Sequence, residues 1–333
     1  MNDALLIAGG LILLVAGGEL FVRGAVQIAE RMGVSPLLIG LTLVGFGTST
    51  PELVTSVKAS LAGSPGIAVG NIVGSNIANV LVILGIAALI TPIAVGRGAL
   101  RRDGTIGAAV ALAFAGVGVF GMLDRAVGTL FLAGLVAYIA YAWREESRGE
   151  PDHTAAFEKA LAFEEVHPSG LHVTHASAPG AGWKGVAISS GFAFGGLVLV
   201  VFGGGLLVDG AAGLARGLGV SETVIGLTIV AIGTSMPELV TSVIAALRRH
   251  ADVALGNVLG SNIYNILGIG GATALLAPTP IPAAIVAYDV WVMLGVSLLL
   301  LVVARTGWRI GRREGAALMA LYVVYVWSIW PVA

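Results

Sequence analysis

Two glutamates, Glu52 and Glu238, lie deep inside long apolar stretches of the sequence. An ionised carboxylate in the hydrocarbon interior of a membrane is costly unless it is paired or coordinated, so each is a candidate functional group. Packing against a neighbouring helix would explain one such acid, but two acids in the same local sequence favour a shared chemical role. Neither glutamate has a Lys or Arg near it at the centre of these stretches. The sequence therefore predicts that a bound cation or a proton neutralises them.

Hydroxyl groups precede each glutamate at helical spacing. Residues four positions apart lie on one face of a helix, and both stretches place a Thr there with a Ser beside it, namely Thr48 and Ser49 before Glu52, and Thr234 and Ser235 before Glu238. Pro51 and Pro237 have no N–H, so each leaves the carbonyl four residues earlier without its helical partner. In lipid such a carbonyl needs protein, water or an ion. A simple kink with back-bonding hydroxyls is the alternative to a cation cage.

A second pair of motifs adds further oxygen atoms. Each holds a Ser and an Asn four residues apart, namely Ser75 with Asn79 and Ser261 with Asn265. Hydroxyl, amide, carbonyl and carboxylate oxygens are hard ligands that suit Ca²⁺ or Na⁺. The chain has no cysteine and no histidine near these motifs, which argues against zinc or copper. For Asn76 and Asn262 we expect hydrogen bonds between helices instead.

Both sets of motifs belong to one internal repeat. Residues 33–85 align with residues 219–271 at a constant offset of 186 without gaps, and 31 of the 53 positions are identical. "GTSTPE" corresponds to "GTSMPE", and "GSNIAN" corresponds to "GSNIYN". Inverted repeats with interrupted helices are typical of secondary transporters, whose substrate site lies near the midplane of the membrane.

The composition predicts a helical membrane protein. Hydrophobic residues make up 57% of the 333 residues and charged residues only 11%, against roughly a quarter charged in soluble domains. Ten apolar segments are long enough to cross a membrane: residues 4–22, 35–61, 66–90, 104–122, 126–143, 184–208, 220–247, 253–277, 284–304 and 314–330. We therefore expect an all-α polytopic protein with ten transmembrane helices in two inverted five-helix repeats. The first repeat is residues 1–143, the second is residues 183–333, and residues 144–182 form a linking loop.

The placement of Lys and Arg predicts the orientation, because cytoplasmic loops are enriched in both. With both termini outside, 15 of the 18 basic residues fall on the inner side and three, Lys58, Arg125 and Arg216, fall on the outer side. The loop of residues 144–182 is then cytoplasmic, and the expected location is a cell inner membrane. The net charge of −1 gives no indication of nucleic-acid binding.

The linking loop contains His167, His172 and His175 among several acidic residues. A regulatory metal or Ca²⁺ sensor would explain this composition, but a solvated linker is the simpler interpretation. Within the loop, Thr154–Val166 could form a short amphipathic helix with Phe157 and Leu161 on one side.

The paired motifs closely resemble the two alpha-repeats of the cation/Ca²⁺ antiporter superfamily, especially its prokaryotic sodium/calcium exchangers. The resemblance covers nearly the whole chain. It implies that Glu52 and Glu238 are central bridging ligands, that the nearby hydroxyls line flanking sodium sites, and that the carbonyls of Gly45 and Ala231 contribute oxygens. It also implies that the first and sixth helices slide across the remainder to expose the site to each side in turn. Asn79 and Asn265 depart from the aspartate that members of the superfamily often carry there.

The resulting hypothesis is antiport of Na⁺ for Ca²⁺, with both ions and membrane lipid as the only partners needed. No cofactor is expected, and a monomer is sufficient. Two carboxylates would be neutralised by one Ca²⁺, whereas three Na⁺ would leave one positive charge, which points to electrogenic exchange. Proton-coupled or K⁺-dependent antiport would use the same glutamates. A cation channel is less compatible with the repeat, and an enzyme is not expected because HExxH, Cys and paired intramembrane Asp are all lacking.

Overall fold

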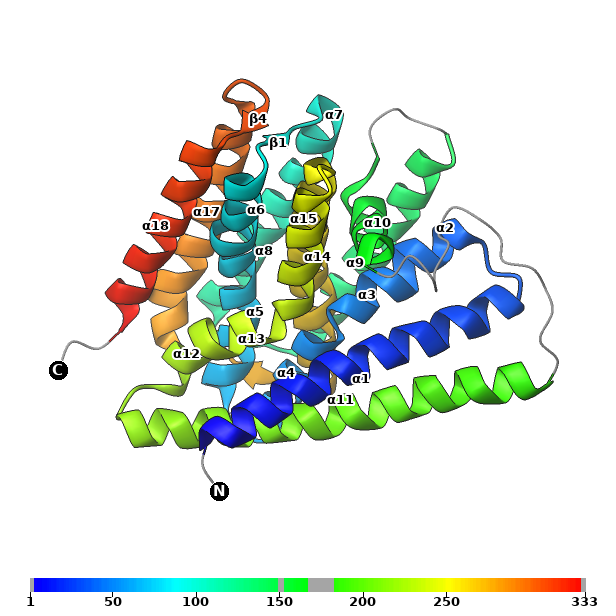
Figure 1. The fold of residues 1–333 in the computed structure, drawn as a ribbon. Coiled ribbons are helices and arrows are strands. Elements are labelled where there is room, and N and C mark those ends of the chain that lie inside the picture. Colours follow the sequence, from blue (N-terminus) through cyan, green and yellow to red (C-terminus); the bar gives the residue numbers. More distant parts are fainter. Residues whose placement is uncertain (1–2, 149–152, 167–182, 331–333) are drawn as a thin grey trace.

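The computed structural model describes residues 3–148, 153–166 and 183–330, and these residues are almost entirely helical (Figure 1). The first half contains α1 (Asp3–Arg31), α2 (Pro36–Ile39), the π-helical segment η1 (Gly40–Val44), α3 (Gly45–Thr48), α4 (Thr50–Leu61), α5 (Pro65–Ala78), η2 (Asn79–Ile83), α6 (Leu84–Ile90), β1 (Ile93–Ala94), α7 (Arg97–Ala99), η3 (Leu100–Gly104), α8 (Thr105–Phe120), β2 (Met122–Leu123) and α9 (Arg125–Glu146).

A short helix, α10 (Ala155–Val166), precedes the second half. That half contains α11 (Trp183–Leu218), α12 (Glu222–Ile225), η4 (Gly226–Val230), α13 (Ala231–Thr234), α14 (Met236–Leu247), α15 (Ala251–Ile263), η5 (Tyr264–Gly270), α16 (Gly271–Leu276), β3 (Thr279–Pro280), η6 (Ile285–Asp289), α17 (Val290–Arg305), β4 (Arg309–Ile310) and α18 (Arg312–Ile329). Adding 186 to the bounds of η1, α3 and α4 gives the bounds of η4, α13 and α14, so the offset of the sequence repeat recurs in the structure.

The expectation of a multi-pass helical membrane protein is confirmed. Six helices are long and apolar enough to cross a membrane, and the number is eight if each of two bent helix pairs counts as one span. The bent pairs are residues 37–61 and residues 222–247, with bends of 51° and 49°. Two of the ten predicted segments, residues 253–277 and 314–330, coincide with α15 to α16 and with α18 but lie outside this set of eight.

Each bend falls where the sequence predicts an interruption. Ser49 and Ser235 separate the two helices of each pair, with φ and ψ of −91° and 12° and of −81° and 13°, outside the helical range. Pro51 and Pro237 follow at the start of the next helix, where the missing N–H of proline costs nothing. The interruption therefore sets the first turn of α4 and of α14, with its glutamate, at the break.

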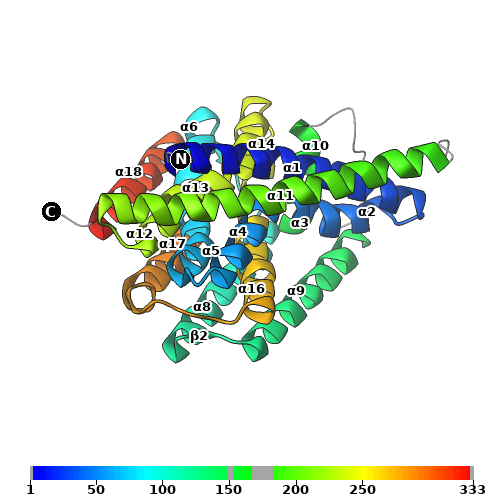
Figure 2. The ribbon, with the colours of Figure 1, turned by 90° about the horizontal axis from the view of Figure 1, so that it is seen from below.

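Two helices are longer than the sequence predicts. α1 has 29 residues and α11 has 36, whereas the expected segments ended at residues 22 and 208. At 1.5 Å per residue, each is longer than the roughly 30 Å of membrane hydrocarbon. Figures 1 and 2 show why: α1 and α11 lie side by side and cross one face of the bundle obliquely.

A seam of glycines joins these two helices. The glycines recur every seven residues on both, at Gly10, Gly17 and Gly24 of α1 and at Gly196, Gly203 and Gly210 of α11. A Cβ atom on Gly10 would lie 2.7 Å from Leu207 N, and one on Gly203 would lie 2.8 Å from Gly10 O. Because only glycine allows such close backbone approach, α1 and α11 pack as a single unit.

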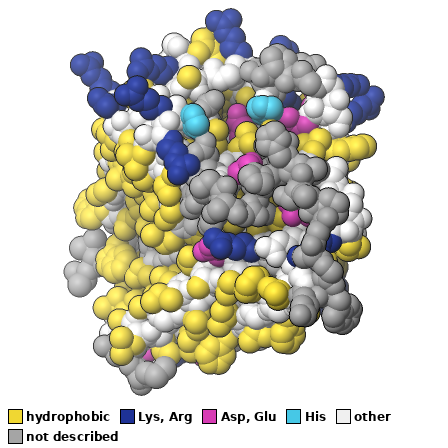
Figure 3. Space-filling view, turned by 45° about the vertical axis from the view of Figure 1, so that its right-hand side comes forward, with side chains coloured by type: hydrophobic (Ala, Val, Ile, Leu, Met, Phe, Trp, Pro, Cys, Tyr) yellow, Lys and Arg dark blue, Asp and Glu magenta, His cyan; other side chains and the backbone are white. Residues whose placement is uncertain are grey.

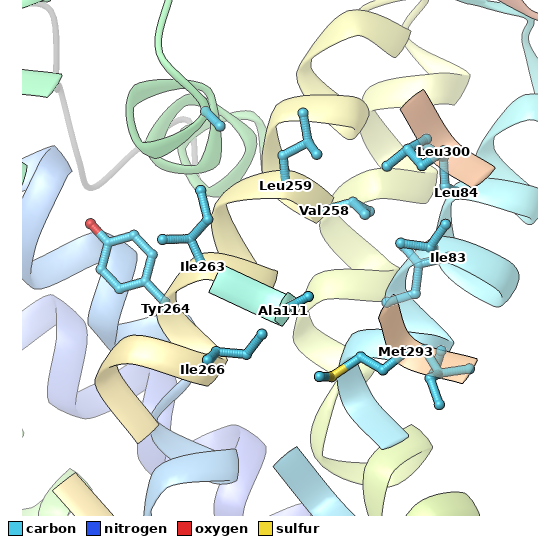
Figure 4. Close-up of a cluster of buried hydrophobic side chains, with 14 of the residues drawn as sticks. Ile83, Leu84, Ala111, Val258, Leu259, Ile263, Tyr264, Ile266, Met293 and Leu300 are labelled. Atoms are coloured by element: carbon cyan, nitrogen blue, oxygen red, sulfur yellow. The ribbon is translucent and has the colours of Figure 1, made fainter. Parts of the chain in front are cut away.

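The remaining helices enclose the apolar core, which Figure 4 shows in part. Side chains from η2, α8, α15 and α17 gather there, including Ile83, Ala111, Val258 and Met293, all of which are buried. Two short antiparallel ladders link the halves, since β1 pairs with β4 and β2 pairs with β3. Each ladder therefore takes one strand from each half.

Charged residues are concentrated at one end of the bundle. Figure 3 shows Lys and Arg along the upper rim, with mostly hydrophobic side chains on the flank below. This end holds β1, β4 and α7 at the top of Figure 1. Its exposed arginines include Arg97, Arg101, Arg248, Arg249, Arg305, Arg309, Arg312 and Arg313, all of which the sequence assigned to the inner side.

The helix predicted within Thr154–Val166 is confirmed as α10, but its interpretation as part of a solvated linker is wrong. Its alanines at 155, 156, 160 and 162 are buried, and so are Phe157 and Phe163. The reason is a matching surface on α15: a Cβ on Gly260 would lie 2.8 Å from Ala155 O, and one on Gly256 would overlap the side chain of Glu158. The three loop histidines, His167, His172 and His175, lie outside the described residues.

Candidate functional site

The two interrupted helices bring Glu52 and Glu238 together in the interior, where their exposed fractions are 1% and 2%. Each carboxylate accepts a hydrogen bond from the opposite half of the chain. Ser235 Oγ donates to Glu52 Oε1 at 2.9 Å, and Ser49 Oγ donates to Glu238 Oε1 at 3.2 Å. The serines at the two breaks thus join the halves through the acids.

Two amides fix the backbone of the glutamates. Asn71 Nδ2 donates to the carbonyl of Glu52 at 3.2 Å, and Asn257 Nδ2 donates to the carbonyl of Glu238 at 3.2 Å. Both amides also donate to a serine one turn further along, at 2.9 Å and 2.8 Å. These asparagines hold the first turns of α4 and α14 against α5 and α15.

Several oxygen atoms of the predicted ligands have no hydrogen-bond partner within the described parts of the chain. They are Thr48 Oγ1, Glu52 Oε2, Glu238 Oε2, Asn79 Oδ1 and Asn265 Oδ1. Buried polar atoms are rarely left unpaired, because the loss of hydration is costly. All five are buried acceptors of the hard type that Ca²⁺ and Na⁺ prefer, so the residues fit a cation as cargo.

Two further hydroxyls among the predicted ligands bond to groups of the opposite half. Ser75 Oγ donates to the carbonyl of Ala231 at 3.3 Å, and Thr234 Oγ1 donates to Asn71 Oδ1 at 2.9 Å. Gly45 begins α3 as Ala231 begins α13. A Cβ on Gly45 would lie 2.8 Å from the hydroxyl of Tyr264, so a larger residue there would displace the tyrosine ring.

The second motifs meet at the centre of the bundle through their amides. Asn79 Nδ2 donates to Asn262 Oδ1 at 2.9 Å, and Asn262 Nδ2 donates to the carbonyl of Asn76 at 3.3 Å. The interhelical hydrogen bond expected for Asn262 is confirmed. Asn76 instead donates to Ile72 O of its own helix, at 2.7 Å.

One cation reaches the site from outside the repeats. Lys159 of α10 has an exposed fraction of 0%. Its Nζ lies 3.1 Å from Glu238 Oε1, 3.2 Å from Ser49 Oγ and 2.5 Å from Ser261 Oγ. The expectation that only a bound cation or a proton neutralises the glutamates is therefore wrong for Glu238, which pairs with a lysine of the linking loop.

Sequence reasoning missed Lys159 because it assigned the whole loop to solvent. Two signals were present. The segment "AAFEKALAFEE" places its single lysine among small and aromatic residues, which is unusual for a solvated linker. The two intramembrane acids also had no basic partner within the repeats.

Comparison with known proteins identifies the family. The family described as sodium/calcium exchanger protein matches residues 3–144 and 188–330. The sodium/calcium exchanger MaX1 of Methanosarcina acetivorans is 37% identical over 341 residues, covering 95% of this chain and 95% of MaX1. The inner membrane protein YrbG of Escherichia coli is 34% identical over 327 residues, covering 98% of this chain and 96% of YrbG.

Solved structures agree. The sodium-calcium exchanger NCX_Mj, soaked with Na⁺ and Sr²⁺, is 32% identical with a TM-score of 0.61, and the match covers 98% of this chain and 99% of NCX_Mj. Family and fold thus agree over nearly the whole length. This chain belongs to the sodium/calcium exchanger family of membrane antiporters, which pair the transport of Ca²⁺ with that of another cation and are not enzymes.

Proposed function

We propose that this protein exchanges Na⁺ for Ca²⁺ across the membrane by alternating access, with both ions bound on Glu52 and Glu238. The observation that carries the proposal is the pair of buried carboxylates, each bonded to a serine of the opposite half and each retaining an unpartnered oxygen in the described structure. MaX1 and NCX_Mj, similar over nearly the whole chain, are named as sodium/calcium exchangers.

In this proposal the two carboxylates bridge Ca²⁺ and supply its neutralising charge. Ser75, Ser261, Asn79 and Asn265 add hydroxyl and amide oxygens from the second motifs. The first motifs add hydroxyls and carbonyls, from Thr48, Ser49, Thr234 and Ser235 and from the backbone of Gly45 and Ala231. Ca²⁺ takes about six to eight oxygen ligands, so this set is large enough to hold it and to divide into separate sodium sites.

The architecture that we propose is ten spans in two inverted repeats, residues 1–143 and 183–333, joined by residues 144–182. Five spans per repeat is an odd number, so the second repeat would enter the membrane from the opposite side. The first strand of the first half pairs with the second strand of the second half, and the reverse pairing also occurs, as β1–β4 and β2–β3. This reciprocal pairing supports a two-fold relation between the halves. Access would alternate as α1 and α11, held together by their glycine seam, move across the other helices.

For the orientation we propose that the arginine-rich end, near which α10 lies, faces the cytoplasm and that both termini face outward. YrbG, a bacterial relative matched over 96% of its length, is named as an inner membrane protein, and we propose the same location. The linking loop would then reach the ion site from the cytoplasmic side.

The test is uptake of radioactive Ca²⁺ into Na⁺-loaded proteoliposomes diluted into Na⁺-free buffer. We expect uptake that requires internal Na⁺ and that Glu52→Gln abolishes. Glu145→Gln, at the surface end of α9, is the matched control and is expected to transport normally. Uptake that ignores Na⁺ and follows a pH gradient would replace sodium coupling by proton coupling, and failure of uptake under either gradient would refute Ca²⁺ transport.

A further inference from the structure

We propose that α10 is a built-in competitor of the transported cation, with the ammonium of Lys159 occupying the ion site and α10 closing the path to it. This inference rests on the proposed function, because it takes the site of Glu52 and Glu238 as the transport site. It adds a regulatory role for the linking loop, in which the protein blocks its own site until the ion displaces the helix.

The ammonium is fully satisfied where it lies. A lysine Nζ carries three N–H donors, and three acceptors surround Lys159 Nζ: one carboxylate oxygen of Glu238 and the hydroxyls of Ser49 and Ser261. All three belong to the predicted ion ligands and come from both halves of the chain. A hard cation and this ammonium would therefore compete for the same oxygens.

α10 lies on the glycine surface of α15, and the equivalent surface of α5 in the first half has a different partner. Gly70 and Gly74 of α5 approach the backbone of η4 so closely that a Cβ on Gly70 would lie 3.0 Å from Leu227 N. The corresponding glycines of α15, 186 residues later, approach α10 instead. By the symmetry proposed above, η1 should pack on α15 in the opposite access state, and α10 now lies between α15 and η1. The helix would have to leave before that state can form.

The N-terminal end of α10 is anchored by three hydrogen bonds. Asp103 Oδ2 accepts the N–H of Ala155 at 3.1 Å, Glu146 Oε1 accepts the N–H of Thr154 at 2.5 Å, and Arg102 Nη2 donates to His153 O at 2.6 Å. The carboxylates of Asp103 and Glu146 thus lie at the N-terminus of α10, where negative charge is favourable. The tether keeps Lys159 near the site after release, so its effective concentration stays high, on the order of millimolar.

Competition of this kind has a measurable consequence. The apparent dissociation constant of an ion rises as the fraction of protein with an open site falls. Replacing Lys159 by a neutral residue should then tighten Ca²⁺ binding without adding any ligand. We expect the Lys159→Ala protein to bind Ca²⁺ about tenfold more tightly than wild type, corresponding to an open fraction of about one tenth.

The first experiment measures equilibrium binding of radioactive Ca²⁺ to the purified full chain in Na⁺-free buffer, for wild type, Lys159→Ala and Lys58→Ala. Lys58, on α4 and outside the site, is the matched control and should bind as wild type does. Equal affinity of wild type and Lys159→Ala would overturn the inference and leave the proposed function intact. Failure of both to bind Ca²⁺ would instead refute the proposed function, and this inference with it.

The second experiment uses the absence of cysteine from the chain. Ala160, with an exposed fraction of 0%, is replaced by the only cysteine, and its labelling by a water-soluble maleimide is timed. We expect slow labelling without ions, faster labelling with Ca²⁺, and fast labelling without ions when Lys159→Ala is added. An Ala245→Cys protein, buried in α14, should stay protected throughout. Labelling of Ala160→Cys that Ca²⁺ does not change would overturn displacement of the helix.

Discussion

The two halves of this exchanger carry the same site motifs but differ in what packs on them. In the first half, Gly70 and Gly74 of α5 lie against η4 of the second half. In the second half, Gly256 and Gly260 of α15 lie against α10, which belongs to neither repeat. The same surface thus has a partner from the repeat in one case and a partner from the linking loop in the other.

The hydrogen bonds differ in the same way. Thr234 Oγ1 donates to Asn71 Oδ1 at 2.9 Å, whereas its counterpart Thr48 has no partner for Oγ1 among the described residues. Ser75 Oγ donates to the carbonyl of Ala231, whereas its counterpart Ser261 accepts from Lys159. The contacts between the halves on the α5 side are therefore replaced on the α15 side by contacts with α10.

An internal repeat specifies two matching surfaces but not what packs on each of them. Identical glycines make two equivalent surfaces, but a carrier that opens to one side at a time uses only one of them for contact between its halves. The other surface is free to bind something else, and here it binds α10. Substitutions on the two surfaces can show whether they are equivalent apart from that occupant.

The largest effect is expected from the two glutamates. Glu52→Gln and Glu238→Gln should each lower Ca²⁺ transport by at least about a hundredfold, because removing one of two buried charges weakens binding by several kcal/mol. Only Glu238→Gln should also release α10, since it leaves the ammonium of Lys159 without its carboxylate. Maleimide labelling of Ala160→Cys in the Glu52→Gln and Glu238→Gln proteins distinguishes release of α10 from loss of Ca²⁺ transport. Equal protection in both would mean that Glu238 does not hold the helix.

The next largest effect compares the two glycine surfaces. A Cβ on Gly74 would meet backbone atoms of Leu227 within the bundle, so Gly74→Ala should destabilise the protein by about 1–3 kcal/mol. A Cβ on Gly260 would lie 2.8 Å from Ala155 O of α10, and α10 can move away. The Gly260→Ala protein should therefore keep its thermal stability. It should bind Ca²⁺ more tightly than wild type, because α10 is displaced. It should transport Ca²⁺ more slowly, because the added methyl group would also hinder the packing of η1 on α15 in the opposite access state.

Thermal unfolding in detergent and Ca²⁺ binding measure both effects. Gly9→Ala on α1, where a Cβ would meet nothing within 4 Å, controls for the general effect of replacing a glycine in a helix. Equal destabilisation by Gly74→Ala and Gly260→Ala would show that α10 is as fixed a part of the bundle as η4 is.

Much of the fold and most of the site geometry follow from local sequence. Pro51 and Pro237 fix the two breaks, and the glutamates and hydroxyls around them come together as their spacing predicts. Each of these features acts within a few residues, so one sequence is enough to find it. The ends of α1 and α11 were predicted too early because these helices tilt and continue past the apolar stretch. On α1, for example, Arg23 lies beyond the predicted end and pairs with Glu19 on the helix surface.

What the sequence did not predict depends on contacts between distant segments. The position of α10 is decided by the glycines of α15 and by the unbalanced charge of Glu238, and neither is visible from the loop itself. A second example is the pair of buried aspartates 186 residues apart, Asp103 and Asp289. Each accepts a hydrogen bond from a tyrosine, Tyr138 at 3.1 Å and Tyr325 at 2.9 Å, yet these residues lie outside the aligned repeats.

A smaller effect is expected from the two threonines. Thr234→Ala removes the hydrogen bond to Asn71 and should lower the free energy of unfolding by about 1 kcal/mol. Thr48→Ala removes a hydroxyl that bonds to nothing in the described structure, so it should leave stability unchanged and weaken ion binding. Unfolding and Ca²⁺ binding on both variants test this difference. A larger loss of stability for Thr48→Ala would contradict the asymmetry between the halves.

The smallest effect compares the two aspartates. Asp103 pairs with Tyr138, Arg102 and the N–H of Ala155, whereas the side chain of Asp289 bonds to Tyr325 alone among the described residues. Asp103→Asn should weaken the anchor of α10 by about 1 kcal/mol and so tighten Ca²⁺ binding by up to about fivefold. Asp289→Asn, which removes the equivalent carboxylate far from α10, should leave Ca²⁺ binding unchanged. Neither aspartate touches the proposed ion site, so a change confined to Asp103→Asn would have to act through α10. Matched changes in both variants would instead mean that the aspartates act on the bundle alone.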